Sequence, residues 1–207
     1  MPARSAPRPG LRIVAGTLKG RRLLGPTWTG LRPTSDRLRE TLFNILGETC
    51  QNASVLDAFA GTGAVGIEAL SRGAAHVMFV DHDPRALSLI RQNLDRCGVR
   101  DGYTIQRMDL ARSGPAFAKA AERTPAVPTT FDLIFLDPPY ETNPTTACEA
   151  LAPSVRDDGV LIVEHARRMD VPDAIVELRR SRTVNSGDSA ISFYRRTQSE
   201  PEIGEAA

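Results

Sequence analysis

The fold of this chain is set by the stretch Phe131-Asp132-Leu133-Ile134-Phe135-Leu136-Asp137-Pro138-Pro139-Tyr140. Leu133 to Leu136 is a run of four large apolar residues, which indicates a strand buried on both faces of a parallel sheet. The two prolines end this strand in an extended turn because proline cannot donate a hydrogen bond to the next strand. Open α/β sheets bind ligands at the carboxyl ends of their strands. We therefore expect Asp137 and Tyr140 to be held rigidly at a ligand-binding crevice.

The residues Asp137, Pro138, Pro139 and Tyr140 suit a reaction in which an amino group on an aromatic ring acts as the nucleophile. Such a nitrogen is a weak nucleophile because its lone pair is delocalised into the ring. The Asp137 carboxylate can accept one N–H and the Pro138 carbonyl the other, which aims the lone pair at an electrophile. Asp137 would stabilise the developing positive charge, and the Tyr140 ring would stack on the base. The alternative is an ordinary turn after a strand, because Asp and Pro are common in turns.

Length and composition indicate one soluble α/β domain. The chain has 207 residues, of which 41% are hydrophobic, and no apolar run approaches the ~18 residues of a membrane span. We expect no signal peptide, because no apolar region follows the first residues. Cys50, Cys97 and Cys148 lack the spacing of a disulfide framework or a metal site. This pattern favours reduced, buried thiols in the cytoplasm and predicts no metal centre.

The formal net charge of +1 hides an asymmetry along the chain. Residues 1–39 carry nine basic side chains and one acid, Asp36, so their charge is +8, whereas the remaining 17 basic and 24 acidic residues give −7. A basic leading segment indicates a polyanionic partner, or alternatively a solvated basic face. The candidate contacts to a nucleic acid are Arg12, Lys19, Arg21, Arg22, Arg32, Arg37 and Arg39.

The leading segment, residues 11–53, is predicted to form a small basic hairpin and a helix. Apolar pieces around Gly16 and Gly20 are typical of a hairpin over residues 11–24. Thr34 or Ser35 can cap a helix whose apolar residues follow at helical spacing until Gly47. We expect disordered tails at residues 1–10, with three prolines and two arginines, and at residues 197–207.

A nucleotide-binding fingerprint opens the main domain, residues 54–196. A predicted strand at residues 54–57 is followed by Phe59-Ala60-Gly61-Thr62-Gly63-Ala64-Val65-Gly66 and a helix to about residue 72. Gly61 and Gly63 permit a ligand to approach the backbone, and Gly66 permits close packing of helix on sheet. The second strand, residues 76–80, ends in Asp81, where a carboxylate is placed to take both ribose hydroxyls of an adenosine.

Strands continue to alternate with helices through the rest of the chain. After a helix over residues 84–97 and a strand over residues 103–107, Asp109 could accept the adenine amino group and Met108 could lie against its ring, with His82 flanking the adenosine. A strand-end aspartate is as often a helix cap. An amphipathic helix within residues 111–130, a helix at 145–152, and strands at 159–164, 174–178 and 189–195 complete the pattern. It predicts a mostly parallel seven-stranded sheet whose last two strands form an antiparallel hairpin.

These motifs resemble those of class I S-adenosylmethionine-dependent methyltransferases that methylate amino groups. The segments 11–16, 20–23, 31–44 and 56–63 resemble more closely the bacterial small-subunit ribosomal RNA guanine-N2 methyltransferases of the RsmD type. The resemblance spans residues 11–196 and implies a Rossmann-like fold, S-adenosylmethionine as cofactor, and one guanine of 16S rRNA in a partly assembled 30S subunit as target. It places the cofactor against Asp57, Phe59, Ala60, Gly61, Gly63, Asp81, His82, Met108 and Asp109. Thr34 and Arg39 would close over the methionine end or the RNA.

Three other functions share part of this pattern. A DNA adenine-N6 methyltransferase has both motifs but usually an additional recognition domain, for which no large insertion is visible. A nicotinamide-dependent dehydrogenase accounts for the glycines and Asp81 but not for residues 137–140. An RNA-binding module without activity accounts for the basic end but not for an intact cofactor loop. Nothing in the residues requires more than a monomer, and methyl transfer from a sulfonium requires no metal.

Overall fold

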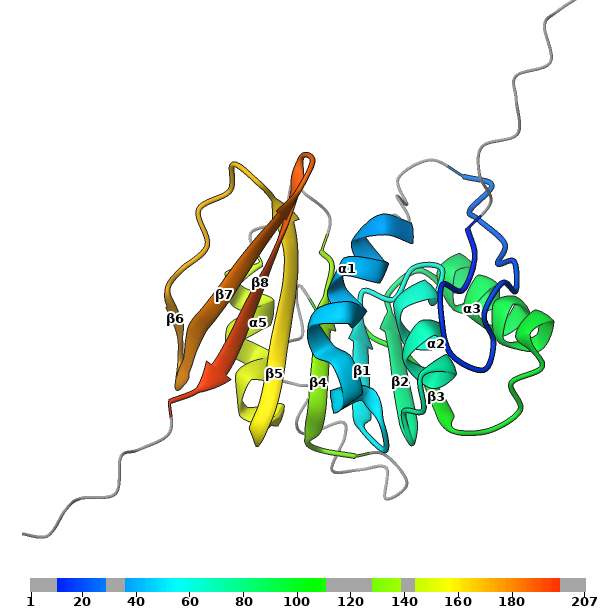
Figure 1. The fold of residues 1–207 in the computed structure, drawn as a ribbon, viewed down its shortest axis with the longest axis horizontal. Helices are drawn as coiled ribbons and strands as arrows, with labels where there is room; N and C mark the ends of the chain where they lie inside the picture. The colour runs from blue at the N-terminus through cyan, green and yellow to red at the C-terminus, as the bar shows by residue number, and fades with distance from the viewer. Residues whose placement is uncertain (1–10, 29–35, 111–127, 139–143, 198–207) are drawn as a thin grey trace, which may run out of the picture.

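The structure is a computed structural model that describes residues 11–28, 36–110, 128–138 and 144–197. Most of both predicted tails and of the helix predicted within residues 111–130 lies outside these ranges. The helical elements are α1 (Asp36–Leu46), η1 (Gly47–Cys50), α2 (Ala64–Ser71), α3 (Pro84–Cys97), α5 (Thr145–Leu151) and η2 (Ala152–Ser154) (Figure 1). The strands are β1 (Ser54–Ala58), β2 (His76–Asp81), β3 (Tyr103–Arg107), β4 (Phe131–Leu136), β5 (Val155–Ala166), β6 (Ala174–Ile175), β7 (Leu178–Ser186) and β8 (Ser189–Arg196).

The described strands form one sheet in the order β3-β2-β1-β4-β5-β8-β7-β6. The first five strands are parallel, β8 is antiparallel to β5, and β7 pairs antiparallel with β8. The predicted Rossmann-like fold with a terminal antiparallel hairpin is therefore confirmed. The described sheet has eight strands rather than the expected seven. In place of one strand at residues 174–178 there are two, the short β6 and the longer β7 that begins at Leu178. Val176, with φ of 53°, and Glu177 form the turn between β6 and β7.

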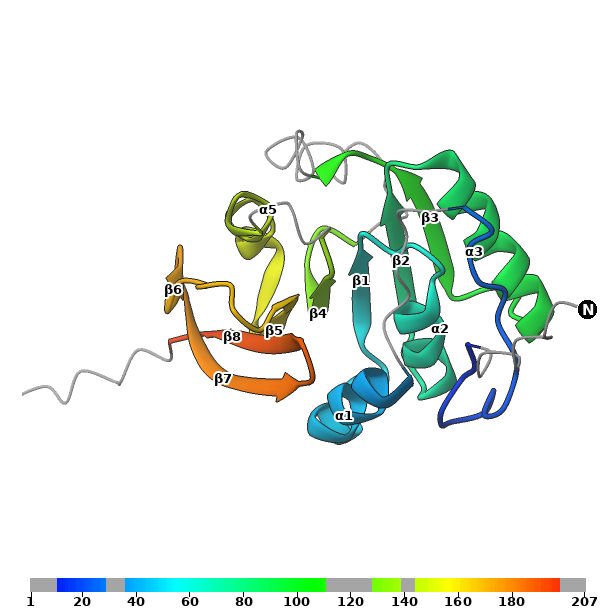
Figure 2. The same cartoon turned by 90° about the horizontal axis from the view of Figure 1, so that it is seen from above.

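Helices lie on both faces of the sheet (Figure 2), and a separate cluster of buried apolar residues lies on each face. One contains the buried residues of α1, α2 and α3 together with one side of the strands, such as Phe43, Ile67, Leu94 and Phe135. The other contains α5 and the opposite side of the strands, such as Leu56, Ile134 and Leu151. The central strands are buried on both sides, which is why they read as continuous apolar runs.

The N-terminal segment folds as the predicted hairpin and packs against α2. Arg12 and Arg22 form an antiparallel bridge, and the Ile13 amide donates to the Arg21 carbonyl at 3.0 Å. Gly16 has φ of +80°, and a Cβ atom there would lie 1.9 Å from the Ser71 carbonyl oxygen of α2. Glycine at this position therefore allows the hairpin to approach helix α2 closely. Among the described helices, none is long and apolar enough to cross a membrane.

Candidate functional site

The carboxyl ends of three neighbouring strands meet in one row. Ala58 at the end of β1 pairs with Val80 of β2 and with Leu136 of β4. The residues that follow them, Phe59, Asp81 and Asp137, therefore lie side by side at the same edge of the sheet. Strands lie about 4.8 Å apart, so the backbones of Asp81 and Asp137 are separated by about 10 Å across the end of β1. A nucleoside-sized ligand can bridge this separation.

The loop between β1 and α2 turns tightly across the end of β1. Phe59, Gly61 and Gly63 all have positive φ, at 61°, 53° and 75°. The Ala60 amide donates to the Val80 carbonyl at 2.9 Å and the Gly63 amide to the Ala60 carbonyl at 2.7 Å. A left-handed Phe59 costs roughly 1–3 kcal/mol and persists only where its surroundings fix it. The loop therefore has a defined shape on which a ligand can rest.

Gly66 brings α2 close to the sheet. A Cβ atom at this position would lie 2.3 Å from Cε1 of Phe79 and 2.8 Å from Cγ1 of Val77. No real side chain tolerates such contacts, so only glycine permits this helix position. The close packing expected from the third glycine of the fingerprint is confirmed.

Asp81 is fixed by backbone hydrogen bonds at the end of β2. It is only 7% exposed, and its two carboxylate oxygens accept the backbone N–H groups of Gly61 and Asp83, both at 2.9 Å. Each oxygen has a second lone pair, so the carboxylate can still accept hydroxyl groups. The exposed His82 ring lies beside it, with Nδ1 at 3.5 Å from Asp81 Oδ1. This fixed acceptor beside the glycine loop fits the adenosine part of S-adenosylmethionine.

Asp57 lies under the loop. Its carboxylate accepts the Gly66 amide at 2.8 Å and is almost fully buried. Burial raises the pKa of Asp57 from 3.8 to about 7, the Gly66 hydrogen bond opposes this shift, and the charge of Asp81 adds to it. Asp57 therefore fixes the first turn of α2 and changes its charge near neutral pH.

The end of β3 lies beside the end of β2. The Met108 amide donates to the Asp81 carbonyl at 3.0 Å, and Met108 and Asp109 are both half-buried. Met108 and Asp109 therefore lie at the same edge of the sheet as Asp81.

Asp137 follows the last residue of β4 and is half-buried, whereas Pro138 is buried. The acid is therefore not enclosed in the core. Pro139, Tyr140, Thr34 and Arg32 lie outside the described residues. The structure places the remaining candidate cofactor residues and Asp137 on one edge.

Most of the candidate nucleic-acid contacts that lie within the described residues are on the surface. Arg12, Lys19, Arg21 and Arg22 are exposed on the N-terminal hairpin, and Arg37 is exposed on α1. The prediction for Arg39 is wrong, since its side chain is 0% exposed.

The guanidinium of Arg39 bonds within the protein. It donates to the Arg12 carbonyl at 2.8 Å and to Asp36 Oδ1 at 2.5 Å, and it forms an ion pair with Glu68 at 3.6 Å. Its spacing to Phe43 and Leu46 puts it on the apolar side of α1, which the sequence could have indicated.

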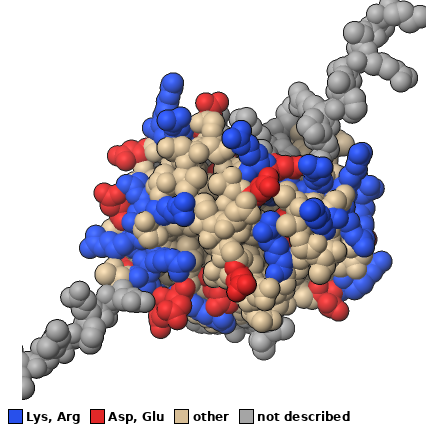
Figure 3. Space-filling model, viewed as in Figure 1, with Lys and Arg blue, Asp and Glu red and all other residues tan. Residues whose placement is uncertain are grey.

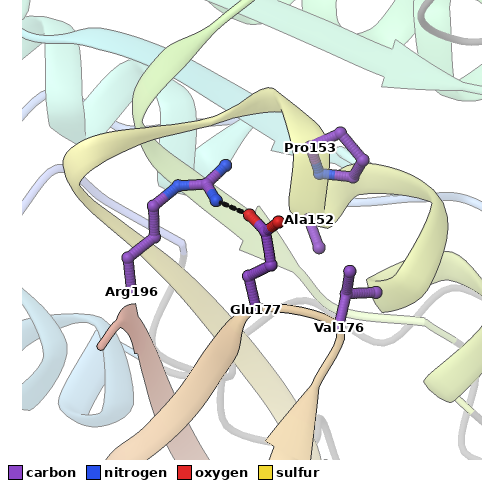
Figure 4. A pocket seen from close by; sticks show the side chains of 5 residues that line it. All are labelled: Ala152, Pro153, Val176, Glu177 and Arg196. Carbon is purple, nitrogen blue, oxygen red and sulfur yellow. Dashed lines mark hydrogen bonds and ion pairs between the residues drawn. The ribbon is translucent and has the colours of Figure 1, made fainter. Parts of the chain in front are cut away.

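A small pocket lies at the opposite edge of the sheet, near the start of β5 (Figure 4). It is lined by Ala152, Pro153, Val176, Glu177 and Arg196, and the last two form an ion pair. Its volume is about 160 Å³, below the ~300 Å³ at which ligand pockets begin. This pocket does not compete with the carboxyl edge as the cofactor site.

A family model described as Conserved hypothetical protein 95 matches residues 11–195. The chain belongs to this family. It is 34% identical over 189 residues to a Bacillus subtilis (strain 168) protein named "Putative rRNA methyltransferase YlbH", covering 90% of this chain and 99% of that protein. The "Ribosomal RNA small subunit methyltransferase D" of Haemophilus influenzae is 38% identical over 135 residues, 64% of this chain and 65% of that protein. The structure of "Putative methyltransferase yhhF from Escherichia coli" matches with a TM-score of 0.72 at 29% identity, covering 91% of this chain and 98% of that chain.

The family match includes the N-terminal hairpin, and two buried polar residues join this hairpin to helix α2 and to the glycine loop. Glu68, 0% exposed, accepts the Val14 amide at 2.7 Å and the Ala15 amide at 2.9 Å. Asn93 accepts the Leu24 amide at 2.7 Å and donates to the Thr62 carbonyl at 2.9 Å. Sequence reasoning missed both residues. A carboxylate in the otherwise apolar helix α2 was a usable signal, because such residues are buried only with partners.

Proposed function

We propose that this protein transfers a methyl group from S-adenosylmethionine to the exocyclic N2 amino group of one guanine in 16S rRNA. The observation that carries the proposal is the common edge of Asp81, the glycine loop and Asp137, which brings a nucleoside cofactor and a planar amine within reach of each other. The names of the relatives, which describe rRNA methyltransferases, support this class of reaction.

The protein's part in this reaction is to position the reactants. S-adenosylmethionine supplies a methyl group already activated by its sulfonium. Asp81 accepts the ribose hydroxyls, and the backbone of the glycine loop supports the methionine part. Met108 and Asp109 would contact the adenine ring.

On the substrate side, Asp137 and the Pro138 carbonyl each accept one N–H of the guanine amine, which directs its lone pair at the methyl group. Tyr140 stacks on the guanine, which must be unstacked from the RNA at a cost of a few kcal/mol. Positive charge that develops on the nitrogen is stabilised by Asp137.

The RNA would be held by the exposed arginines of the N-terminal hairpin, where Arg21 and Arg22 project from the surface. We propose a monomer that acts in the cytoplasm on an assembling 30S subunit. Phosphate contacts of this kind make binding sensitive to salt.

The test is mass spectrometry of 16S rRNA from cells that lack the gene. We expect one guanine to lose one methyl group, and the wild-type gene to restore it. A gene carrying Asp137→Ala should fail to restore it although the purified variant still binds S-adenosylmethionine by calorimetry. Unchanged rRNA, or methylation of duplex DNA in preference to rRNA, would contradict the proposal.

A further inference from the structure

The β7–β8 hairpin contains a concentration of arginines away from the N-terminal segment. Among its exposed residues are Arg179 and Arg182 on β7 and Arg195 on β8. In Figures 1 and 2, helix α5 lies on one side of this hairpin, and α1 lies over the central strands rather than over β7. Figure 3 shows basic side chains gathered over the β7–β8 side of the molecule as well as over the N-terminal side.

A β-bulge places these three arginines on one side of the hairpin. Arg179 pairs with Arg195, and Arg180 with Tyr194, but the next pair is Arg182 with Phe193, so that Ser181 is the extra residue. Side chains alternate along a regular strand, and residues three apart would face opposite sides. The bulge reverses this alternation, so Arg182 faces the same side as Arg179.

The charges on this side are not neutralised within the described parts of the chain, where none of the three arginines forms an ion pair. On the other side of the same hairpin, Arg180 pairs with Asp173 and Arg196 with Glu177. Arg179 and Arg195 lie directly opposite each other, an arrangement of like charges that is destabilising unless an anion offsets it. The arrangement therefore points to an external anion.

This basic side lies within reach of RNA bound at the catalytic edge. Arg182 pairs with Phe193, which pairs with Ile162, which in turn pairs with Phe135 of β4. Arg182 is therefore level with Phe135, which precedes Asp137 by two residues along the chain. Along the sheet, Arg182 lies about 14 Å across from β4 and about 7 Å below Asp137. Two more exposed arginines, Arg167 and Arg168, follow the carboxyl end of β5, next to the turn between β7 and β8.

We propose that Arg179, Arg182 and Arg195 form a second RNA-binding surface, which contacts phosphates of the rRNA that flank the target base. This inference rests on the proposed function, because it assumes an rRNA substrate. The N-terminal hairpin and the β7–β8 hairpin would then hold the RNA on either side of Asp137. Arginine suits this contact since its guanidinium binds phosphate with two hydrogen bonds.

The test compares two double variants with the same change in net charge. Arg179→Gln with Arg182→Gln removes two charges of the proposed surface, whereas Arg100→Gln with Arg156→Gln removes two exposed charges near the opposite edge of the sheet, each paired with an aspartate. Binding to unmodified 16S rRNA transcribed in vitro is measured by filter binding between 50 and 300 mM KCl. Affinity for S-adenosylmethionine and the urea unfolding midpoint are measured for each variant.

We expect the first variant to bind rRNA roughly tenfold more weakly at 100 mM KCl and to lower the slope of log affinity against log salt by about 2. The control should change affinity less than threefold, and both variants should keep the wild-type cofactor affinity. Equal losses of rRNA affinity in the two double variants would overturn the proposal. It would also be overturned if the first variant bound 30S particles more weakly but naked rRNA as well as the wild type does, since the surface would then contact a protein partner. If the wild-type protein itself neither binds nor methylates rRNA, the proposed function fails instead.

Discussion

At the scale of the residue, Asp57 has an ionisation that the sequence does not show. Its carboxyl group is buried beside Asp81, and the burial raises the pKa from 3.8 to about 7. The folded protein therefore holds this proton more tightly than the unfolded chain does. The resulting stabilisation is complete below pH 3.8 and is lost as the pH rises through about 7.

Replacing Asp57 with Asn should remove this pH dependence, because the amide oxygen still accepts the Gly66 N–H but carries no charge. Between pH 5.5 and 8 we expect the wild-type free energy of unfolding to fall by up to about 2 kcal/mol from this group, and that of Asp57→Asn to fall by less. Urea unfolding at both pH values measures the difference. Parallel pH dependences in the two proteins would mean that Asp57 is already ionised at pH 5.5.

Gly66 provides a second test at this scale. Gly66→Ala forces a Cβ atom against Phe79 and Val77, so we expect a loss of stability of about 1–3 kcal/mol and weaker binding of S-adenosylmethionine. Gly25→Ala is the matched control, because a Cβ there meets no atom within 4 Å. Urea unfolding and calorimetry measure the two effects. If Gly66→Ala behaved like its control, the close approach of α2 would not matter for the site.

Single residues differ in how far the sequence reveals their roles. The strand-end acids Asp81 and Asp137 and the glycines were predictable because local pattern fixes their position. Arg39 was misjudged because its charge suggested a surface, whereas its partner Glu68 lies 29 positions away in the sequence. A charged residue reveals its burial only through partners that folding brings together.

At the scale of the element, β7 was the strand that the sequence concealed. Its residues LRRSRTVNS show no apolar alternation because most of them are solvent-exposed on both sides. Alternation appears only where one side of a strand is buried. The strand was therefore predicted at the apolar residues 174–178. The structure has β6, a turn and only the first residue of β7 there.

The N-terminal hairpin is the element that the proposed function assigns to RNA. Arg21 and Arg22 use their backbone carbonyls for internal bonds while their side chains are exposed. Arg21→Glu with Arg22→Glu should therefore lower rRNA affinity at least tenfold in 100 mM KCl without changing cofactor affinity. Filter binding and calorimetry measure the two quantities. A parallel loss of cofactor affinity would show that these side chains support the fold.

At the scale of the whole molecule, the question is whether residues 11–53 and 54–196 are independent. The hairpin residues Ile13 and Leu23 and the α1 residue Phe43 belong to the same buried cluster as the strand residue Phe135. Glu68 and Asn93 add hydrogen bonds across the same boundary. We infer that the two segments form one cooperative unit.

The single tryptophan allows this inference to be tested. Trp28 lies in the N-terminal segment, with the Arg85 guanidinium 5.0 Å from its ring centroid, whereas far-UV circular dichroism reports mainly the sheet and the later helices. In urea we expect the two signals to change in one coincident transition. S-adenosylmethionine at 100 times its Kd should raise the free energy of unfolding obtained from each signal by about 2.7 kcal/mol. Arg85→Gln, as a control, should alter the native tryptophan emission while leaving the coincidence intact. An earlier tryptophan transition, unaffected by cofactor, would instead make the hairpin and α1 a separate unit that can open while the cofactor domain stays folded.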